Sequence, residues 1–260
     1  MEDDLALLTE AATEAGRIAL SYWKQSPKAW DKGDGAGPVT EADLAVNDML
    51  HARLRAARPG YGWLSEETPD TPDRLATPRV FIIDPIDGTR AFIAGEPSFA
   101  HALAVVEAGR VVAGVVFLPA TSLMYAATAT GPAPCNGAPI SASDRASIDG
   151  ARALAGAAAL APEHWPGGVP DMKRSFRPSL AWRMCLVADG SFDATLTPRP
   201  TWEWDIAAGA LIAERAGATV TDHHGAALRF NRPDPRSNGL IAAAPALHAA
   251  LMQRRRGLQS

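Results

Sequence analysis

The feature that most constrains the fold of this chain is a short apolar run, Val80–Ile83, followed by Asp84-Pro85-Ile86-Asp87-Gly88-Thr89. A β-branched run of this length is typical of a buried strand, and we expect the strand to stop at the proline. Open α/β sheets bind their ligands at the rim where strands end. Two aspartates at such a rim can hold one hard cation, and the Gly-Thr turn offers N–H groups and a hydroxyl to an oxyanion. The pattern predicts a metal site beside a phosphate.

The spacing of the two aspartates argues against one class of phosphatase. Enzymes that form an aspartyl-phosphate carry D-x-D-G-T, with a single residue between the aspartates, and use one of them as the nucleophile. Two residues separate Asp84 from Asp87 here, so the favoured nucleophile is a metal-activated water. An ordinary strand end with acidic turn residues is the alternative that this motif alone leaves open.

Composition limits the partners and the location of the protein. With 260 residues, 47% of them hydrophobic and 21% charged, the chain is typical of a globular protein of one domain or two subdomains. Its net charge of −4 argues against a nucleic-acid polymer as partner, because such proteins carry a basic surface. The acidic start, residues 1–4, does not resemble a signal peptide, and the longest apolar run, 153–161, is too short to cross a bilayer. Because Cys135 and Cys185 are isolated, we expect core packing for both, a cytoplasmic protein and no membrane partner.

Apolar periodicity and turn residues predict a chain of mixed helices and strands. We expect helices at 4–24, from an N-cap at Thr40 to about 57, at 206–216 and at 245–255, and strands at 61–64, 80–83, 101–106, 111–117, 123–127, 218–221 and 240–243. Residues 154–160 and 185–188 fit strands or buried segments. This order of elements indicates a layered α/β protein.

Loops and a subdomain boundary are predicted from glycine and proline. The glycine-rich residues 33–37 and the proline-rich residues 70–78 fit surface loops. A stretch rich in Gly, Pro, Ser and Ala at 131–150 is the expected boundary. We therefore predict an N-terminal α+β subdomain over 1–140 and a C-terminal α/β subdomain over 141–260.

Three more acids stand at the ends of predicted elements. Glu66 follows a strand, Asp43 lies just after a helix cap, and Asp205 begins a helix. Taken singly, each has an ordinary explanation, because aspartate favours helix N-termini and a loop glutamate can be solvated. Their shared placement, together with that of Asp84 and Asp87, favours one common site.

Four motifs of the chain resemble those of the inositol monophosphatase superfamily, which are Mg²⁺-dependent, lithium-sensitive phosphatases. They occur in the family's order, as Pro38–Asp43 (P-V-T-x-x-D), Ser65–Glu67 (a Glu-Glu pair), Asp84–Thr89 (D-P-[IL]-D-G-T) and Trp204–Gly209 (W-D-x-A-A-G). The resemblance spans residues 5–250. It implies a layered αβαβα sandwich of the sugar-phosphatase type, with the active site between two subdomains. The family is commonly dimeric, which makes a homodimer the candidate assembly.

The resemblance also assigns metal ligands. Glu66, Asp84 and the Ile86 carbonyl would hold one Mg²⁺, and Asp84, Asp87 and Asp205 would hold a second. A third, weaker ion would use Glu66, giving two to three ions per site. Inhibition by Li⁺ follows from the resemblance alone.

Catalytic and substrate-binding roles follow in the same way. Thr89, hydrogen-bonded to Asp43, would orient and deprotonate the attacking water, and the Gly88 and Thr89 amides would bind the phosphate. The catalytic residues would be Asp43, Glu66 and Thr89. The substrate, a small-molecule phosphate ester, would be bound by Asp87, Gly88, Thr89, Arg183, Arg199 and Asp205.

Two departures from the inositol-phosphatase pattern bear on the substrate. Residues 89–93 lack the asparagine of D-G-T-x-N-F, and Pro198 replaces a glutamate that contacts inositol hydroxyls in that subfamily. Both regions look closer to the 3'(2'),5'-bisphosphate nucleotidases of sulfur assimilation. A second phosphate would need arginine forks, and the chain has a basic cluster of Lys173, Arg174, Arg177, Arg183 and Arg199. For any single member, a solvated face or a structural ion pair is the alternative.

The sequence therefore predicts a Mg²⁺-dependent phosphomonoesterase that converts 3'-phosphoadenosine 5'-phosphate to AMP and phosphate. An inositol-1-monophosphatase is the second candidate and a histidinol-phosphate phosphatase the third. A catalytically idle metal-binding scaffold is the alternative from another class, and the complete set of acids speaks against it. We expect His101 to be a core histidine, while Trp202 and Trp204 fit either stacking on a base or packing around the site.

Overall fold

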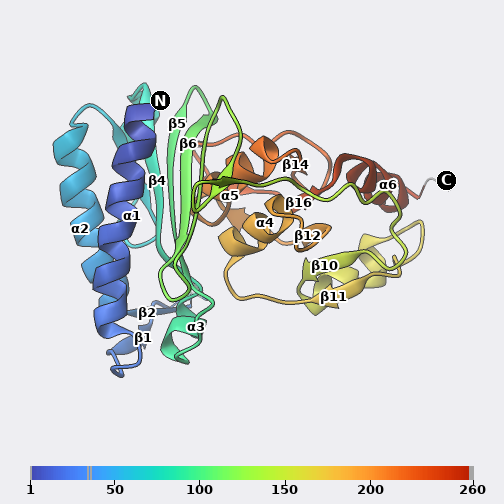
Figure 1. Cartoon of the computed structure of the whole chain (residues 1–260), viewed down its shortest axis with the longest axis horizontal. Helices are drawn as coiled ribbons and strands as arrows, with labels where there is room; N and C mark the ends of the chain where they lie inside the picture. Colours follow the sequence, from blue (N-terminus) through green and yellow to red (C-terminus); the bar gives the residue numbers. More distant parts are fainter. Residues whose placement is uncertain (1, 34, 36, 258–260) are drawn as a thin grey trace.

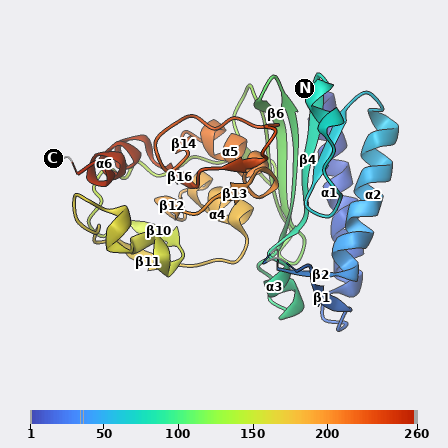
Figure 2. The same cartoon turned by 180° about the vertical axis from the view of Figure 1, so that it is seen from behind.

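The computed structural model describes residues 2–33, 35 and 37–257, which form alternating layers of helix and sheet (Figures 1 and 2). Helices α1 (Glu2–Tyr22) and α2 (Glu41–Ala57) cover one face of a seven-stranded sheet, and α4 (Leu180–Ala188) and α5 (Glu203–Arg215) cover the other. A five-stranded sheet lies beyond α4 and α5, and α6 (Pro245–Arg255) covers its far face. The expected αβαβα sandwich is confirmed.

The seven-stranded sheet carries the aspartate motif on its second strand. Its order is β3 (Gly62–Ser65), β4 (Arg79–Asp87), β5 (Ala100–Glu107), β6 (Arg110–Leu118), β7 (Leu123–Thr128), β8 (Pro134–Cys135) and β9 (Ala138–Pro139). Strand β4 pairs parallel with β3 and antiparallel with β5. The prediction that the strand stops at Pro85 is wrong, because β4 continues to Asp87. The register shifts between Asp84 and Asp87, and such a bulge accommodates a proline that cannot donate to the ladder.

Both faces of this sheet are buried, which explains the unbroken apolar run. Side chains alternate along a strand, so Val80 and Ile82 enter the core under α4 and α5, while Phe81 and Ile83 enter the core under α1 and α2. Helix α5 lies close to the sheet at Gly114, where a Cβ atom would come within 3.1 Å of Ala208 Cα. The absence of a side chain at Gly114 thus lets α5 pack directly on the sheet.

The five-stranded sheet belongs to the second half of the chain. Its order is β11 (Lys173–Ser175), β10 (Arg152–Ala155), β12 (Ala194–Thr197), β16 (Leu240–Ala243) and β14 (Thr219–Thr221). Strand β10 pairs parallel with β11 and β12, and β16 pairs antiparallel with β12 and β14.

Two of the short apolar segments differ from a simple strand. Residues 154–160 comprise the end of β10 and a 3-10 helix, η2 (Ala157–Leu160), and residues 185–188 are the last turn of α4. Runs this short carry no periodicity that separates a strand from a buried helix. The predicted loop at 70–78 contains the 3-10 helix η1 (Pro72–Ala76). The loop predicted at 33–37 includes residues 34 and 36, which lie outside the described residues.

The remaining elements are short. They are the hairpin β1 (Ala29–Asp31) and β2 (Pro38–Thr40), the helices α3 (Thr89–Ile93) and η3 (Pro162–His164), and the ribbon β13 (Thr201–Trp202) and β15 (Arg236–Ser237). The strands of the larger sheet all precede residue 140, but α4 and α5 from the second half share a core with it. The subdomain division at 140 therefore stays a prediction. Among the described residues, no helix is both long and apolar enough to cross a membrane.

Candidate metal centre and active site

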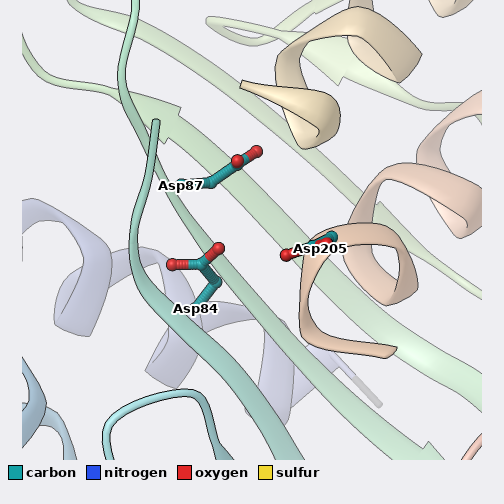
Figure 3. A group of neighbouring side chains, drawn as sticks. All are labelled: Asp84, Asp87 and Asp205. Carbon is teal, nitrogen blue, oxygen red and sulfur yellow. The ribbon is translucent and has the colours of Figure 1, made fainter. Parts of the chain in front are cut away.

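Three of the predicted metal ligands meet where β4 ends beside α5 (Figure 3). Asp84 and Asp87 come from β4 and Asp205 from the first turn of α5, and one carboxylate oxygen of each lies within 4.8 Å of the others. Asp84 is 2% exposed, and its Oδ1 is buried without a hydrogen-bond partner. Burial and the neighbouring acids raise the pKa of Asp84 and of Asp205 well above the usual aspartate range.

This arrangement fits a divalent cation bound by oxygen. Buried carboxylates that repel one another are costly unless a positive charge joins them. All donors are hard oxygens, the ligands that Mg²⁺ prefers. No contact among the described residues satisfies the Oδ1 atom of Asp84, whereas a bound metal ion would.

Asp87 is held in place by the start of α4. Its Oδ2 accepts hydrogen bonds from the Ser179 hydroxyl and the Ala181 backbone N–H, both at 2.7 Å. Ser179 is also the N-cap of α4 and accepts a bond from Trp182 N. One oxygen of Asp87 is thereby committed to the protein, and the other is left to a cation. The sequence did not identify Ser179, which lies 92 residues from Asp87 and signals only a helix start.

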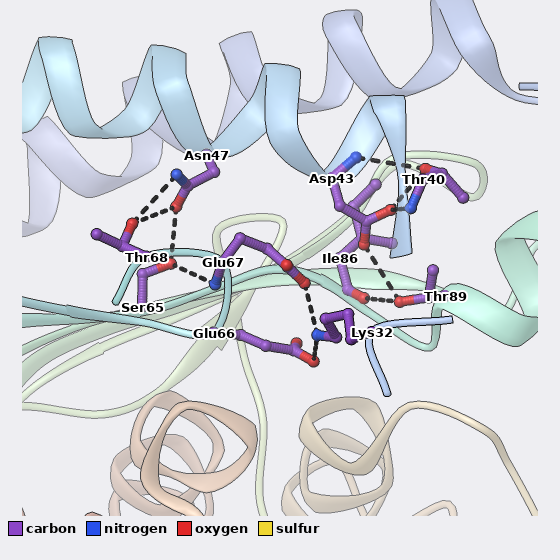
Figure 4. Close-up of polar contacts among 10 residues, drawn as sticks. All are labelled: Lys32, Thr40, Asp43, Asn47, Ser65, Glu66, Glu67, Thr68, Ile86 and Thr89. Carbon is purple, nitrogen blue, oxygen red and sulfur yellow. Dashed lines mark hydrogen bonds and ion pairs between the residues drawn. The ribbon is translucent and has the colours of Figure 1, made fainter. Parts of the chain in front are cut away.

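Glu66, the fourth predicted carboxylate ligand, is paired with a lysine (Figure 4). The charge of Glu66 also acts on Asp84 and Asp205. Lys32 Nζ lies 2.6 Å from Glu66 Oε1 and 2.9 Å from Glu67 Oε1. Burial opposes the charge on Lys32, but the two carboxylates outweigh it and raise the pKa of the ammonium. The pKa of Glu66 is also raised, because the effect of burial exceeds the opposite effect of the positive charge of Lys32. A cationic side chain, that of Lys32, thus lies next to Glu66, and this contact was not predicted from the sequence.

The turn that carries Glu66 is fixed to helix α2. The Ser65 hydroxyl donates to Asn47 Oδ1 at 2.8 Å, and Asn47 Nδ2 donates to the Thr68 hydroxyl at 3.2 Å. These contacts, visible in Figure 4, hold the residue before the Glu-Glu pair, Ser65, and the residue after it, Thr68. The position of Glu66 is therefore set by the fold.

The predicted contact between Thr89 and Asp43 is present. Thr89 Oγ1 lies 3.2 Å from Asp43 Oδ1 and 3.1 Å from the Ile86 carbonyl oxygen, as Figure 4 shows. The other oxygen of Asp43 accepts the Thr40 N–H at 2.9 Å, and Thr40 Oγ1 caps helix α2, so the expected N-cap is confirmed. Burial raises the pKa of Asp43 to about 6. The result is a fixed hydroxyl–carboxylate pair at the motif that carries the predicted metal ligands.

Two residues shape the backbone of the aspartate motif. Gly88 has φ +101°, and a Cβ atom there would lie 2.9 Å from the Ser98 carbonyl oxygen, so glycine is required. It precedes α3, where the first N–H groups of a helix lack intrahelical partners. His101 is fully buried, and its Nδ1 lies 2.5 Å from the Pro85 carbonyl oxygen. The full burial of His101 confirms the expected core histidine, and it lowers the pKa of the imidazole to about 4.

The predicted basic cluster is spread over several elements. Lys173 and Arg174 lie on the edge strand β11, whereas Arg183 lies on α4 and is 8% exposed. Arg183 Nε donates to the Arg177 carbonyl oxygen at 2.5 Å. Burial lowers the pKa of Arg183, and its charge also interacts with those of Asp87, Arg199 and Asp205. The charges of Arg183 and of the exposed Arg199 thus act on predicted metal ligands, Arg183 on Asp87 and Arg199 on Asp205.

The chain is similar to a well-populated set of phosphatases. The sequence model of the Inositol monophosphatase family matches residues 1–260. An inositol-1-monophosphatase of Mesorhizobium japonicum is 30% identical, over 85% of this chain and 86% of the relative. A histidinol-phosphatase of Chlorobaculum parvum is 31% identical over 86% and 88%, and a 3'-phosphoadenosine 5'-phosphate phosphatase of Mycobacterium leprae is 32% identical over 89% and 86%.

The fold agrees with the sequence comparison. The solved structure of the Thermotoga maritima IMPase superposes with a TM-score of 0.84 at 27% identity, over 98% of this chain and 97% of that one. The relatives share one reaction class and differ in their named substrates. The chain therefore belongs to the inositol monophosphatase family and is a phosphoric monoester hydrolase.

Proposed function

We propose that this protein is a Mg²⁺-dependent phosphatase whose preferred substrate is a 3'(2'),5'-bisphosphate nucleotide, with 3'-phosphoadenosine 5'-phosphate giving AMP and phosphate. The observation that carries the metal dependence is the convergence of Asp84, Asp87 and Asp205 within 4.8 Å, next to the Thr89–Asp43 pair. Phosphoryl transfer to water requires metal ligands, a group that takes the proton of the water, and donors for the phosphate oxygens. The carboxylates, the Thr89 hydroxyl and the start of α3 can supply these groups at one rim of the sheet.

The ligand sets follow the family assignment. Glu66, Asp84 and the Ile86 carbonyl would hold one Mg²⁺, and Asp84, Asp87 and Asp205 would hold another, with a weaker third ion at Glu66. Mg²⁺, when bound, lowers the pKa of a water molecule and neutralises charge on the attacking and leaving oxygens. Li⁺ is proposed to inhibit by competing for these positions.

The side chains of the protein would handle the proton of the attacking water. Thr89 can give its hydroxyl proton to Asp43 while it accepts a proton from the water, because Asp43 Oδ1 lies 3.2 Å away. Thr40 keeps Asp43 oriented through two further contacts to Oδ2. The Gly88 and Thr89 N–H groups would hold the phosphate, and Glu66 would complete the catalytic set.

Three observations support a nucleotide bisphosphate over other esters. Arg199 is exposed and its charge acts on Asp205 and Arg183, so its guanidinium is available to a second phosphate. Pro198 cannot accept hydrogen bonds from a polyol through its side chain. A 3'-phosphoadenosine 5'-phosphate phosphatase is among the relatives, at 32% identity. Inositol-1-phosphate is the second candidate, since a relative of that activity is 30% identical.

A substrate panel tests this proposal. The values of kcat/KM would be measured for 3'-phosphoadenosine 5'-phosphate, inositol-1-phosphate, histidinol phosphate and fructose-1,6-bisphosphate. We expect the first to be the best substrate, and Arg199→Ala or Arg183→Ala to weaken bisphosphates more than monophosphates. A preference for inositol phosphate would overturn the substrate choice. Equal losses on both kinds of ester would refute the second-phosphate role.

We also propose a cytoplasmic location and a homodimeric assembly. The location is supported by Cys135 and Cys185, which are both free thiols in the structure. The homodimer is proposed because members of the family are commonly dimeric. Fractionation of cells and light scattering of the purified protein test the two statements.

A further inference from the structure

A pocket of about 420 Å³ adjoins the metal centre. It lies between the turn after β3, which contributes Glu66 and Asp70, and the second half of the chain, which contributes Trp202, Trp204, Asp234 and Arg236. Its volume is within the range of about 300–1,000 Å³ found for small-molecule sites. Glu66 belongs to both the proposed metal site and the pocket, and Trp204 directly precedes Asp205. A group attached to a phosphate at the metal centre can therefore enter the pocket.

One wall of the pocket is aromatic. The rings of Trp202 and Trp204 are stacked, with centroids 4.6 Å apart and planes 9° apart. Trp202 is 40% exposed, although a large apolar side chain gains free energy from burial. The Arg236 guanidinium lies 5.3 Å from the centroid of the Trp202 ring. The Trp202 ring thus has Trp204 stacked on it and the half-exposed Arg236 side chain over it. A planar heterocycle could take the place of this arginine side chain against the ring.

The charged residues of the pocket already have partners of opposite charge. Asp70 pairs with Arg74 at 2.7 Å, and Asp234 pairs with Arg236 at 2.8 Å. Glu66 is paired with Lys32 or, in the proposed holoenzyme, with a metal. A free phosphate or a polyol needs unpaired groups to replace the water it loses. The pocket therefore favours a ring that brings apolar faces and few hydrogen-bonding demands.

The two walls of the pocket are fixed to each other by a buried arginine. Arg74 is 2% exposed and, besides pairing with Asp70, donates to Asn231 Oδ1 at 2.7 Å and to the Arg232 carbonyl oxygen at 2.9 Å. Glu203, at the start of α5, accepts the N–H groups of Asn231 and Arg232 at 2.6 and 3.1 Å. The segment leading to Asp234 is thus anchored to both halves of the chain. A pocket that is already formed loses less free energy to ordering when a ligand binds.

We propose that this pocket receives the base of a nucleotide substrate, so that Trp202 and Trp204 select a leaving group with a planar ring. The proposal rests on the proposed phosphatase function and deepens it. The phosphate would stay at the aspartates while the ring lies against the tryptophan wall. Neither tryptophan would touch the reacting atoms, so both act on substrate binding.

The test compares two phosphate monoesters that differ in their rings. Adenosine 3'-monophosphate carries a base and no second phosphate, and glycerol 2-phosphate carries no ring. For Trp202→Ala, we expect the ratio of kcat/KM for the nucleotide to that for glycerol 2-phosphate to fall about tenfold, mainly through KM, as for loss of one base-stacking contact. Trp202→Phe, which keeps a flat ring, should restore most of the ratio. Trp202→Leu gives the same comparison if the alanine variant does not fold.

Trp30→Ala is the matched control. Trp30 is 45% exposed on β1 and does not line the pocket, so its removal should leave the ratio unchanged. The subsite would be overturned, and the phosphatase reaction would stand, if Trp202→Ala did not lower the ratio of the two kcat/KM values. The same conclusion would follow if Trp202→Ala lowered this ratio no more than Trp30→Ala does. Failure of the wild-type protein to release phosphate from either ester in Mg²⁺ would overturn the reaction itself, and the subsite with it.

Discussion

Asp84 should destabilise the metal-free protein and yet be indispensable for its reaction. Its carboxylate is 2% exposed, one oxygen has no hydrogen-bond partner, and burial followed by Glu66, Asp87 and Asp205 raises its pKa. Asp84→Asn removes the charge and keeps the shape. We therefore expect the variant to be more stable than wild type without metal, to gain nothing from Mg²⁺, and to release no phosphate.

The size of the effect follows from the buried oxygen. A buried polar group without a partner costs about 1–3 kcal/mol, and more when charged. For a chain of this length, 1 kcal/mol corresponds to about 2–4 °C in Tm, so we expect a rise of about 2–12 °C. A raised folded-state pKa stabilises the fold below the unfolded pKa and loses that contribution as pH rises through the folded pKa. The rise should therefore be largest at alkaline pH and small near about pH 4.

Thermal unfolding in a chelator and in Mg²⁺ measures both halves of this prediction. Wild type should gain about 2.7 kcal/mol of stability at a Mg²⁺ concentration of 100 times Kd, and Asp84→Asn should gain none. Asp193→Asn is the matched control, because the pKa of the Asp193 carboxyl is shifted in the opposite direction. Burial alone would raise this pKa, but Arg152, 2.9 Å away, outweighs burial and lowers it. This control should lose stability at alkaline pH. A lower Tm for Asp84→Asn than for wild type in chelator at alkaline pH, or a retained Mg²⁺ response, would refute the reasoning.

Three other substitutions probe the groups around the aspartates. Thr89→Val should lower kcat by about 10²–10⁴ with little change in KM, because it removes the hydroxyl next to Asp43, and steady-state kinetics should show recovery with Thr89→Ser. Ser179→Ala should weaken activation by Mg²⁺ by about 10–100-fold, because Asp87 loses a hydrogen bond that orients it. Lys32→Gln should lower the half-saturating Mg²⁺ concentration by roughly tenfold, because no ammonium then competes for Glu66. Unchanged kcat in the first, or unchanged Mg²⁺ titrations in the other two, would contradict these roles.

The candidate ligands could be predicted from the sequence because their signals are local. Asp84 and Asp87 stand in one short motif, and Asp205 and Asp43 each stand at a helix start that residue types announce. The β-branched run next to the motif predicts a buried strand, and β4 confirms it; its burial on both faces is a finding of the structure. The layered fold follows from the order of helices and strands together with the family resemblance.

The parts that were missed depend on contacts between distant segments. Ser179 reaches Asp87 across 92 residues, and Lys32 reaches Glu66 across 34, so neither has a local signal. The strand continues past Pro85 because an extra residue on β4 forms a bulge opposite β5, which depends on the register of the neighbouring strand. Residues 185–188 were ambiguous because an apolar run of four residues fits a helix and a strand equally well.

The most direct test of the account is the release of inorganic phosphate from 3'-phosphoadenosine 5'-phosphate. It would be measured for wild type in Mg²⁺, for wild type in a chelator, and for Asp205→Asn in Mg²⁺, with circular dichroism to confirm that the variant is folded. We predict rapid release in the first case and none above background in the other two. Undiminished release in the chelator or by Asp205→Asn would contradict metal-dependent hydrolysis at this site.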